Sequence, residues 1–179
     1  MAGRRLTTNM QKGTAMYQRF TPEEVADRLE IYDLFARYIH AADSHDIDAM
    51  DEVFLEDTVF DWTDSGGDRD LWKDAKQGDF ITGKTFEFIF HMCGNLKIVF
   101  GPDGNTAVVD SKTIHPTGLR GRDGEPRLSQ VHGGYTDQLR RTDHGWRIVE
   151  RRWNDAWVVG GLHEVNGIPA MLQEAGVLD

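Results

Sequence analysis

The chain has 179 residues, a hydrophobic content of 39% and a net charge of -10. This length and apolar content predict one packed domain, and the acidic balance argues against nucleic-acid binding, which needs clustered Lys and Arg. The single cysteine, Cys93, excludes an internal disulfide. With no apolar leader and no run of about 20 apolar residues, we expect a cytoplasmic protein without membrane contact. Residues 1–19 are expected to form a mobile arm before a single domain at 20–179.

A long helix is predicted at the start of the domain. Thr21 is a typical N-cap, and Pro22 and the acids that follow suit the first helical turn. Apolar side chains then recur at helical spacing as far as Asp43, namely Ile31, Leu34, Phe35, Tyr38 and Ala42. This stripe predicts an amphipathic helix that ends near Asp43.

Two further helices are predicted before the strands begin. Asp46 or Asp48 is placed to cap a short second helix. The apolar residues of segment 80–90 predict a third helix, capped near Thr82.

The remaining segments alternate as short strands do and are separated by turns rich in Gly and Asp. The expected strands are 58–62, 95–100, 107–115, 128–140 and 146–157. Helices followed by a run of strands predict an α+β domain, with the helices packed on one curved antiparallel sheet. We expect a cone whose open end is a pocket, and a short helix at 169–175.

The strand at 107–115 has two unlike faces. Val108, Asp110, Lys112 and Ile114 share one face, and the residues between them share a small, uncharged one. The uncharged face is the better pocket wall, and His115 lies at its far end. His115 is therefore either a hydrogen-bond donor to a substrate oxygen or a rim histidine before Pro116, with neither alternative favoured.

Alternation in the last strand places Arg151 with Val149 and Trp153 on one face, and Trp146 with Ile148 on the other. Apolar residues on both faces would be expected if the outer face of the sheet packs against another subunit. Arg151 binds an anionic substrate group in one interpretation. In the other, which is slightly favoured, it pairs with an acid such as Asp137 or Glu150.

Several motifs in this order resemble the SnoaL-like branch of the NTF2-like (cystatin-like) superfamily, which includes scytalone dehydratase, the bile-acid 7α-dehydratase and hexachlorocyclohexane dehydrochlorinase. The motifs are Tyr38-x4-Asp43, His91-Met92-x-Gly94-Asn95-Leu96, and Tyr135-Thr136-Asp137 followed by Gly145-Trp146. The resemblance covers residues ~20 to ~157. It implies an NTF2-like cone and self-association, as a trimer in preference to a dimer.

The resemblance also implies a set of site residues. The family's catalytic Asp–His pair falls on Asp43 and His91, its helix tyrosine on Tyr38, and a further polar pocket residue on His115. Arg151 and His132 are the substrate-binding candidates that it adds, and Trp62, in the expected strand at 58–62, is a third candidate. Asp43 as a turn residue, and His91 and Tyr38 as core residues, are the plain structural alternatives.

We therefore expect a lyase or isomerase, dehydratase-like, in which His91 and Asp43 remove a proton from carbon of a small, apolar, oxygenated cyclic substrate. Dehydration, dehydrohalogenation, isomerisation and cyclisation all begin with this step, and the sequence favours none of them. The alternative function is a non-catalytic ligand-binding or assembly module, such as a dioxygenase small subunit. No metal-binding spacing and no phosphate-binding loop occur, so no cofactor is expected.

Overall fold

The computed structural model describes residues 19–65, 67–79, 81–83, 86–120 and 125–160. Its helical elements are α1 (Pro22–Ser44), α2 (Ile47–Asp51), a 3-10 turn η1 (Thr63–Ser65) and α3 (Trp72–Ala75). The strands are β1 (Phe54–Asp61), β2 (Arg69–Leu71), β3 (Phe88–Ile89), β4 (Met92–Phe100), β5 (Thr106–Arg120), β6 (Pro126–Thr142) and β7 (Gly145–Gly160). The helix expected at 169–175 and most of the expected arm lie outside the described residues.

The start of α1 confirms the prediction made from Thr21. The Thr21 hydroxyl accepts from the backbone N–H of Glu24, and the Glu24 carboxylate accepts from the backbone N–H of Thr21. This reciprocal capping box satisfies two of the free N–H groups at the helix start. The predicted second helix is α2, and Asp46 is its N-cap.

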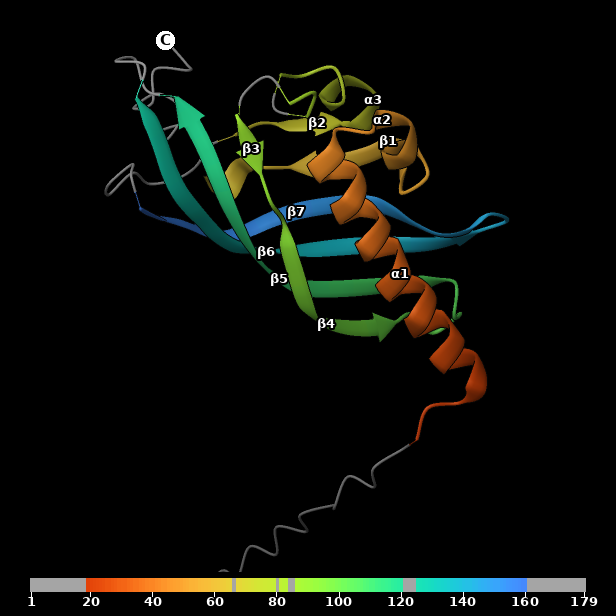
Figure 1. The fold of residues 1–179 in the computed structure, drawn as a ribbon. Coiled ribbons are helices and arrows are strands. Elements are labelled where there is room, and N and C mark those ends of the chain that lie inside the picture. Colours follow the sequence, from red (N-terminus) through yellow and green to blue (C-terminus); the bar gives the residue numbers. More distant parts are fainter. Residues whose placement is uncertain (1–18, 66, 80, 84–85, 121–124, 161–179) are drawn as a thin grey trace, which may run out of the picture.

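The seven strands form one curled sheet in the order β2-β1-β7-β6-β5-β3, with β4 paired to β5. The sheet is mixed, because β1 runs parallel to β7 while the other neighbours are antiparallel. Figure 1 shows α1 lying across the concave side of this half-barrel. The α+β class and the cone of helices on a curved sheet are confirmed.

The core fills the space between α1 and the concave face of the sheet. From α1 it takes Ile31, Leu34, Phe35 and Tyr38, as the helical stripe predicted. From β5 it takes Ala107 and Val109, and the rest of that uncharged face is also buried, namely Ser111, Thr113 and His115. The predicted facing of β5 is therefore confirmed.

The helix predicted for segment 80–90 is wrong. Phe88 and Ile89 form β3, which pairs with Gly118 and Thr117 of β5. The chain then leaves the sheet at 90 and 91 before β4 pairs with the earlier part of β5. A partner about 30 residues away decides the structure here, and helical periodicity in a short apolar run does not detect such a partner. The short helix that does form before this segment is α3.

The facing predicted for the last strand is also wrong. The pairing of β6 with β7 shifts between Ile148 and Glu150, so that Val149 is an extra residue in β7. Such a bulge reverses the alternation beyond it. Trp146, Ile148, Arg151 and Trp153 are consequently all buried on the concave side.

Candidate functional site

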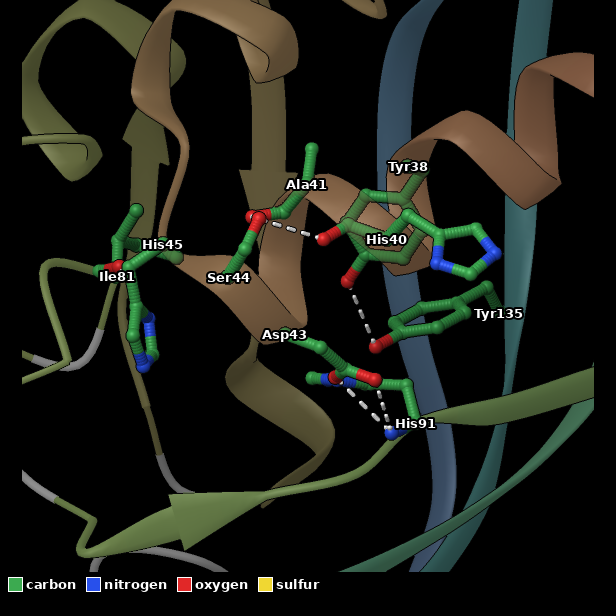
Figure 2. Close-up of polar contacts among 9 residues, drawn as sticks. All are labelled: Tyr38, His40, Ala41, Asp43, Ser44, His45, Ile81, His91 and Tyr135. Atoms are coloured by element: carbon green, nitrogen blue, oxygen red, sulfur yellow. Dashed lines mark hydrogen bonds and ion pairs between the residues drawn. The ribbon is translucent and has the colours of Figure 1, made fainter.

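Asp43 and His91 meet at one end of the concave face, from the C-terminal end of α1 and the break between β3 and β4 (Figure 2). The Nδ1 atom of His91 lies 2.5 Å from Oδ1 of Asp43, and the backbone N–H of His91 also donates to this carboxylate. The imidazole side chain is 7% exposed. Because the carboxylate can only accept, it holds the His91 proton on Nδ1 and leaves Nε2 with its lone pair.

Two tyrosines lie beside this pair. The hydroxyl oxygens of Tyr38, from α1, and Tyr135, from β6, are 3.3 Å apart (Figure 2). Burial is the main cause that raises the pKa of Tyr38, and it raises the pKa of Tyr135 well above the ordinary value of a phenol. Both phenols therefore remain protonated near neutral pH. Since one shared hydrogen bond uses one of the two O–H groups, the other proton is available to a further acceptor.

His115 lies next to His91, with ring centroids 4.2 Å apart. It is 5% exposed, and burial, followed by electrostatic interactions with His91, Arg151 and His132, lowers its pKa to about 2. His115 is therefore a neutral imidazole at physiological pH, which can donate or accept one hydrogen bond but cannot supply positive charge.

Arg151 pairs with Asp137, as in the interpretation slightly favoured from the sequence. Its Nε and Nη2 atoms lie 2.8 and 2.9 Å from the two Asp137 oxygens, and both side chains are at most 1% exposed. Burial opposes the guanidinium charge, but Asp137 and the phenols of Tyr38 and Tyr135 raise the pKa of Arg151 overall. The guanidinium carbon is 4.0 and 4.2 Å from the centroids of those two rings.

An apolar cavity opens beside these groups. Among the described residues its wall has 14, namely Tyr38, Ala42, His45, Met50, Phe54, Phe60, Trp62, Trp72, Ile81, Ile89, His91, His115, Tyr135 and Trp153. Its atom-free space, counted together with the mouth, is about 560 Å³. The part that the centre of a water-sized sphere can reach is only about 30 Å³. That space suits about one water molecule, so a larger ligand must move the aromatic walls apart.

Of the three residues predicted to bind substrate, only one lines the cavity. Trp62 lies in the cavity wall, but His132 does not, because it stacks on Trp157 with ring centroids 4.2 Å apart. Arg151 lies behind Tyr38 and Tyr135 and is also not a wall residue. The roles proposed for these residues stay predictions.

Sequence reasoning missed His45 and Trp153 as wall residues. His45 closes α1 in the left-handed conformation, with φ of 54°, and its Nδ1 is 3.3 Å from the Ile81 carbonyl oxygen (Figure 2). No sequence signal reveals a side chain aimed by such a turn. Trp153 did carry a signal, because it alternates with Arg151 in the same strand.

Within the described ranges, no group of three His, Cys, Asp or Glu side chains could hold a metal ion. Among the same residues, no helix has the length and apolar character needed to cross a membrane.

Comparison with curated proteins identifies relatives in Mycobacterium. An uncharacterized protein of Mycobacterium tuberculosis is 32% identical over 130 residues, which cover 72% of this chain and 84% of the relative. A solved structure of a Novosphingobium aromaticivorans protein, provisionally named an aromatic ring hydroxylase, is 31% identical with a TM-score of 0.65. That alignment covers 77% of this chain and 95% of the other.

More distant structures share the fold. A second Novosphingobium aromaticivorans protein, provisionally named a scytalone dehydratase, has a TM-score of 0.67 at 18% identity, covering 80% of this chain and 92% of the other. A hexachlorocyclohexane dehydrochlorinase has a TM-score of 0.63 at 17% identity, covering 78% and 93%. A family model described as a SnoaL-like domain matches residues 23–152. The chain therefore belongs to the SnoaL-like domain family and has the NTF2-like fold.

Proposed function

We propose that this protein is a lyase or isomerase in which His91 removes a proton from carbon of a small, apolar, oxygenated ring compound. The observation that carries the proposal is the 2.5 Å contact between Asp43 Oδ1 and Nδ1 of His91, whose side chain lies in the wall of an apolar cavity. Asp43 holds the tautomer and stabilises the imidazolium that forms when Nε2 takes the proton.

The developing negative charge on the substrate oxygen needs a donor. The hydroxyl pair of Tyr38 and Tyr135 has one proton left to donate, and His115 adds a neutral imidazole at the same end of the cavity. Donors already in position in a site with little water stabilise such charge strongly. We assign this role to Tyr38 and His115, with Tyr135 as the partner of Tyr38.

The electron pair released at carbon has two fates. It expels a leaving group from the neighbouring carbon, as water or halide, with a proton returned by the His91 imidazolium where the leaving group is hydroxide. Alternatively, the imidazolium returns its proton to another carbon, which completes an isomerisation. The similarity in fold to a protein named a dehydratase and to a dehydrochlorinase supports the elimination branch.

We also propose that the protein is cytoplasmic and self-associates as a trimer. The exposed side chains of Met92, Ile114 and Trp157 support self-association, because strand pairing places them in one row across β4, β5, β6 and β7. Exposed apolar residues grouped in this way are typical of an interface. Sedimentation equilibrium measures the mass in solution, and a monomer at micromolar concentration would contradict the trimer.

The catalytic proposal is tested with cyclohexanone in D2O, by following exchange of the protons next to its carbonyl by proton NMR. We expect the wild-type protein to accelerate exchange and His91→Gln to lower the rate by about 10²- to 10⁴-fold, the usual contribution of a positioned base. His40→Gln is the matched control, because His40 is an exposed histidine of α1. Equal rates for wild type and His91→Gln would reject the mechanism.

The narrowness of the cavity is one observation that favours the non-catalytic alternative. A space of about 30 Å³ holds no ring compound unless the walls move. The same experiment separates the two functions. An assembly module would neither take up the ketone nor accelerate exchange, whereas the enzyme would do both.

A further inference from the structure

Two buried nitrogen atoms that belong to cavity-wall residues have no hydrogen-bond partner among the described residues. They are Nε2 of His115 and Nε1 of Trp153. The two side chains are 5% and 1% exposed. Buried polar groups in folded proteins are nearly always paired, so an unpaired one calls for an explanation such as an absent ligand.

The two nitrogens belong to side chains that lie together. His115, from β5, and Trp153, from β7, are separated by β6 in the sheet, and their ring centroids are 5.3 Å apart with an interplanar angle of 35°. His115 is in turn 4.2 Å, centroid to centroid, from the imidazole of His91. An atom bound by both nitrogens would therefore lie close to the proposed base.

We propose that Trp153 Nε1 and His115 Nε2 together bind one oxygen atom of an uncharged ring substrate. This inference rests on the proposed function and adds Trp153 as a substrate-binding residue. The indole N–H is only a donor, so the bound atom must accept a hydrogen bond. A carbonyl oxygen accepts from both nitrogens. A hydroxyl oxygen accepts from Trp153 and donates its proton to His115.

The restriction to uncharged compounds follows from the cavity wall. None of the 14 wall residues that the structure describes is Asp, Glu, Lys or Arg. Arg151, a buried cation beside the two tyrosines, is bound by Asp137 and lies behind them. While His91 is neutral, a carboxylate or an ammonium group entering this cavity would lose its hydration without meeting an opposite charge on these wall residues.

The walls are also shaped for a ring. Phe60 stacks on Trp62 and on Trp72 with interplanar angles of 24° and 28°. This aromatic end of the cavity wall favours an apolar ligand body, with its one polar substituent directed to the histidine end.

The proposal is tested by titrating 15N-labelled protein with three compounds that share one ring, namely cyclohexanone, cyclohexanecarboxylate and cyclohexylammonium. Two-dimensional NMR follows the indole N–H signals, and Trp153→Phe identifies that of Trp153. The indole N–H of Trp146 already donates to Asp27, and Trp146 is not a wall residue, so its signal is the internal control. We expect cyclohexanone to shift the Trp153 signal downfield and leave the Trp146 signal unchanged.

The dissociation constants supply the second readout. Losing one neutral hydrogen bond in Trp153→Phe should weaken cyclohexanone binding by about 2- to 12-fold. Wild-type protein should bind the two charged compounds at least about 10-fold more weakly than the ketone, because neither finds a countercharge. An unshifted Trp153 signal at saturation, unchanged affinity in Trp153→Phe, or equal affinity for the carboxylate would each overturn the proposal.

Failure of this inference can be distinguished from failure of the proposed catalysis. Binding is measured without turnover, and His91→Gln should bind cyclohexanone with the Trp153 shift intact while losing proton exchange. If the shift is seen but exchange is not accelerated, the oxygen site stands and the catalytic proposal fails. If exchange depends on His91 but the Trp153 signal does not move, only the oxygen site is rejected.

Discussion

Asp137 binds the guanidinium of Arg151 with both carboxylate oxygens directly behind the aromatic rings of Tyr38 and Tyr135. The pair does not reach the cavity, yet it supports the two phenols that do. A buried charge pair placed in this way positions other groups rather than binding substrate itself.

Breaking this pair should be costly, since it leaves one buried charge without its partner. We expect Asp137→Asn or Arg151→Met to lower the free energy of unfolding by about 3–5 kcal/mol. The double variant Asp137→Leu/Arg151→Met removes both charges and should recover most of that loss.

Urea denaturation measures these changes, and the exposed Arg37–Asp33 pair of α1 is the control. Arg37→Ala should cost only about 0.3–0.5 kcal/mol, as an exposed pair four residues apart in a helix does. Single variants of the buried pair that cost no more than Arg37→Ala would contradict the role given to Asp137.

Asp43→Asn removes the negative charge beside His91 but keeps a side chain of similar shape, so it tests how Asp43 acts on the proposed base. An amide side chain can still accept from the His91 backbone N–H, but its NH2 group would donate to Nδ1 and move the ring proton to Nε2. The base would then lack its lone pair, and ketone exchange should fall by about 10²- to 10⁴-fold.

The nitrogen chemical shifts of the His91 ring report this tautomer directly. Asp46→Asn is the matched control, because Asp46 caps α2 and asparagine caps helices equally well. Unchanged exchange and an unchanged tautomer in Asp43→Asn would remove Asp43 from the mechanism.

Burial of His115 should make stability depend on pH. Its pKa is about 2 in the folded protein and near 6.5 when unfolded, so below pH 6.5 only the unfolded chain takes up the proton. The folded protein therefore has its full stability above pH 6.5, and the free energy of unfolding decreases as the pH falls toward 2. Between pH 7 and 5 this amounts to about 2 kcal/mol.

Unfolding by urea at both pH values tests this dependence. In His115→Gln the free energy of unfolding should decrease less between pH 7 and pH 5, because the part caused by His115 is missing. Replacing the exposed His144 by Gln should leave the decrease as it is in wild type. A decrease of the same size in wild type and His115→Gln would show that other groups cause it.

The parts of the fold that local sequence predicts are those governed by local contacts. Thr21 and Glu24 cap α1 within one turn, and alternation in β5 places His115 on the buried face correctly. A regular strand carries its facing in its own residues, so such predictions hold without knowledge of the partner strands.

The wrong predictions concern contacts between distant residues. Phe88 belongs to a strand because Gly118 pairs with it, and Arg151 faces inward because Val149 is an extra residue opposite β6. Neither the distant partner nor the bulge changes the local apolar pattern. The family motifs therefore located the Asp43–His91 pair, and the alternation with Arg151 pointed to Trp153, while His45 emerged only from the fold.

Gly133→Ala tests whether the position of Trp153 controls the oxygen site. A Cβ atom at residue 133 would lie 2.7 Å from Cζ2 of Trp153 and 2.9 Å from the Asn154 carbonyl oxygen, so the indole must shift. We expect cyclohexanone to bind more weakly and to lose its effect on the Trp153 signal. Gly94→Ala is the matched control, because a Cβ there meets nothing within 4 Å. If Gly133→Ala bound the ketone as Gly94→Ala does while the Trp153 signal had moved in the free protein, binding would not depend on the placement of that indole.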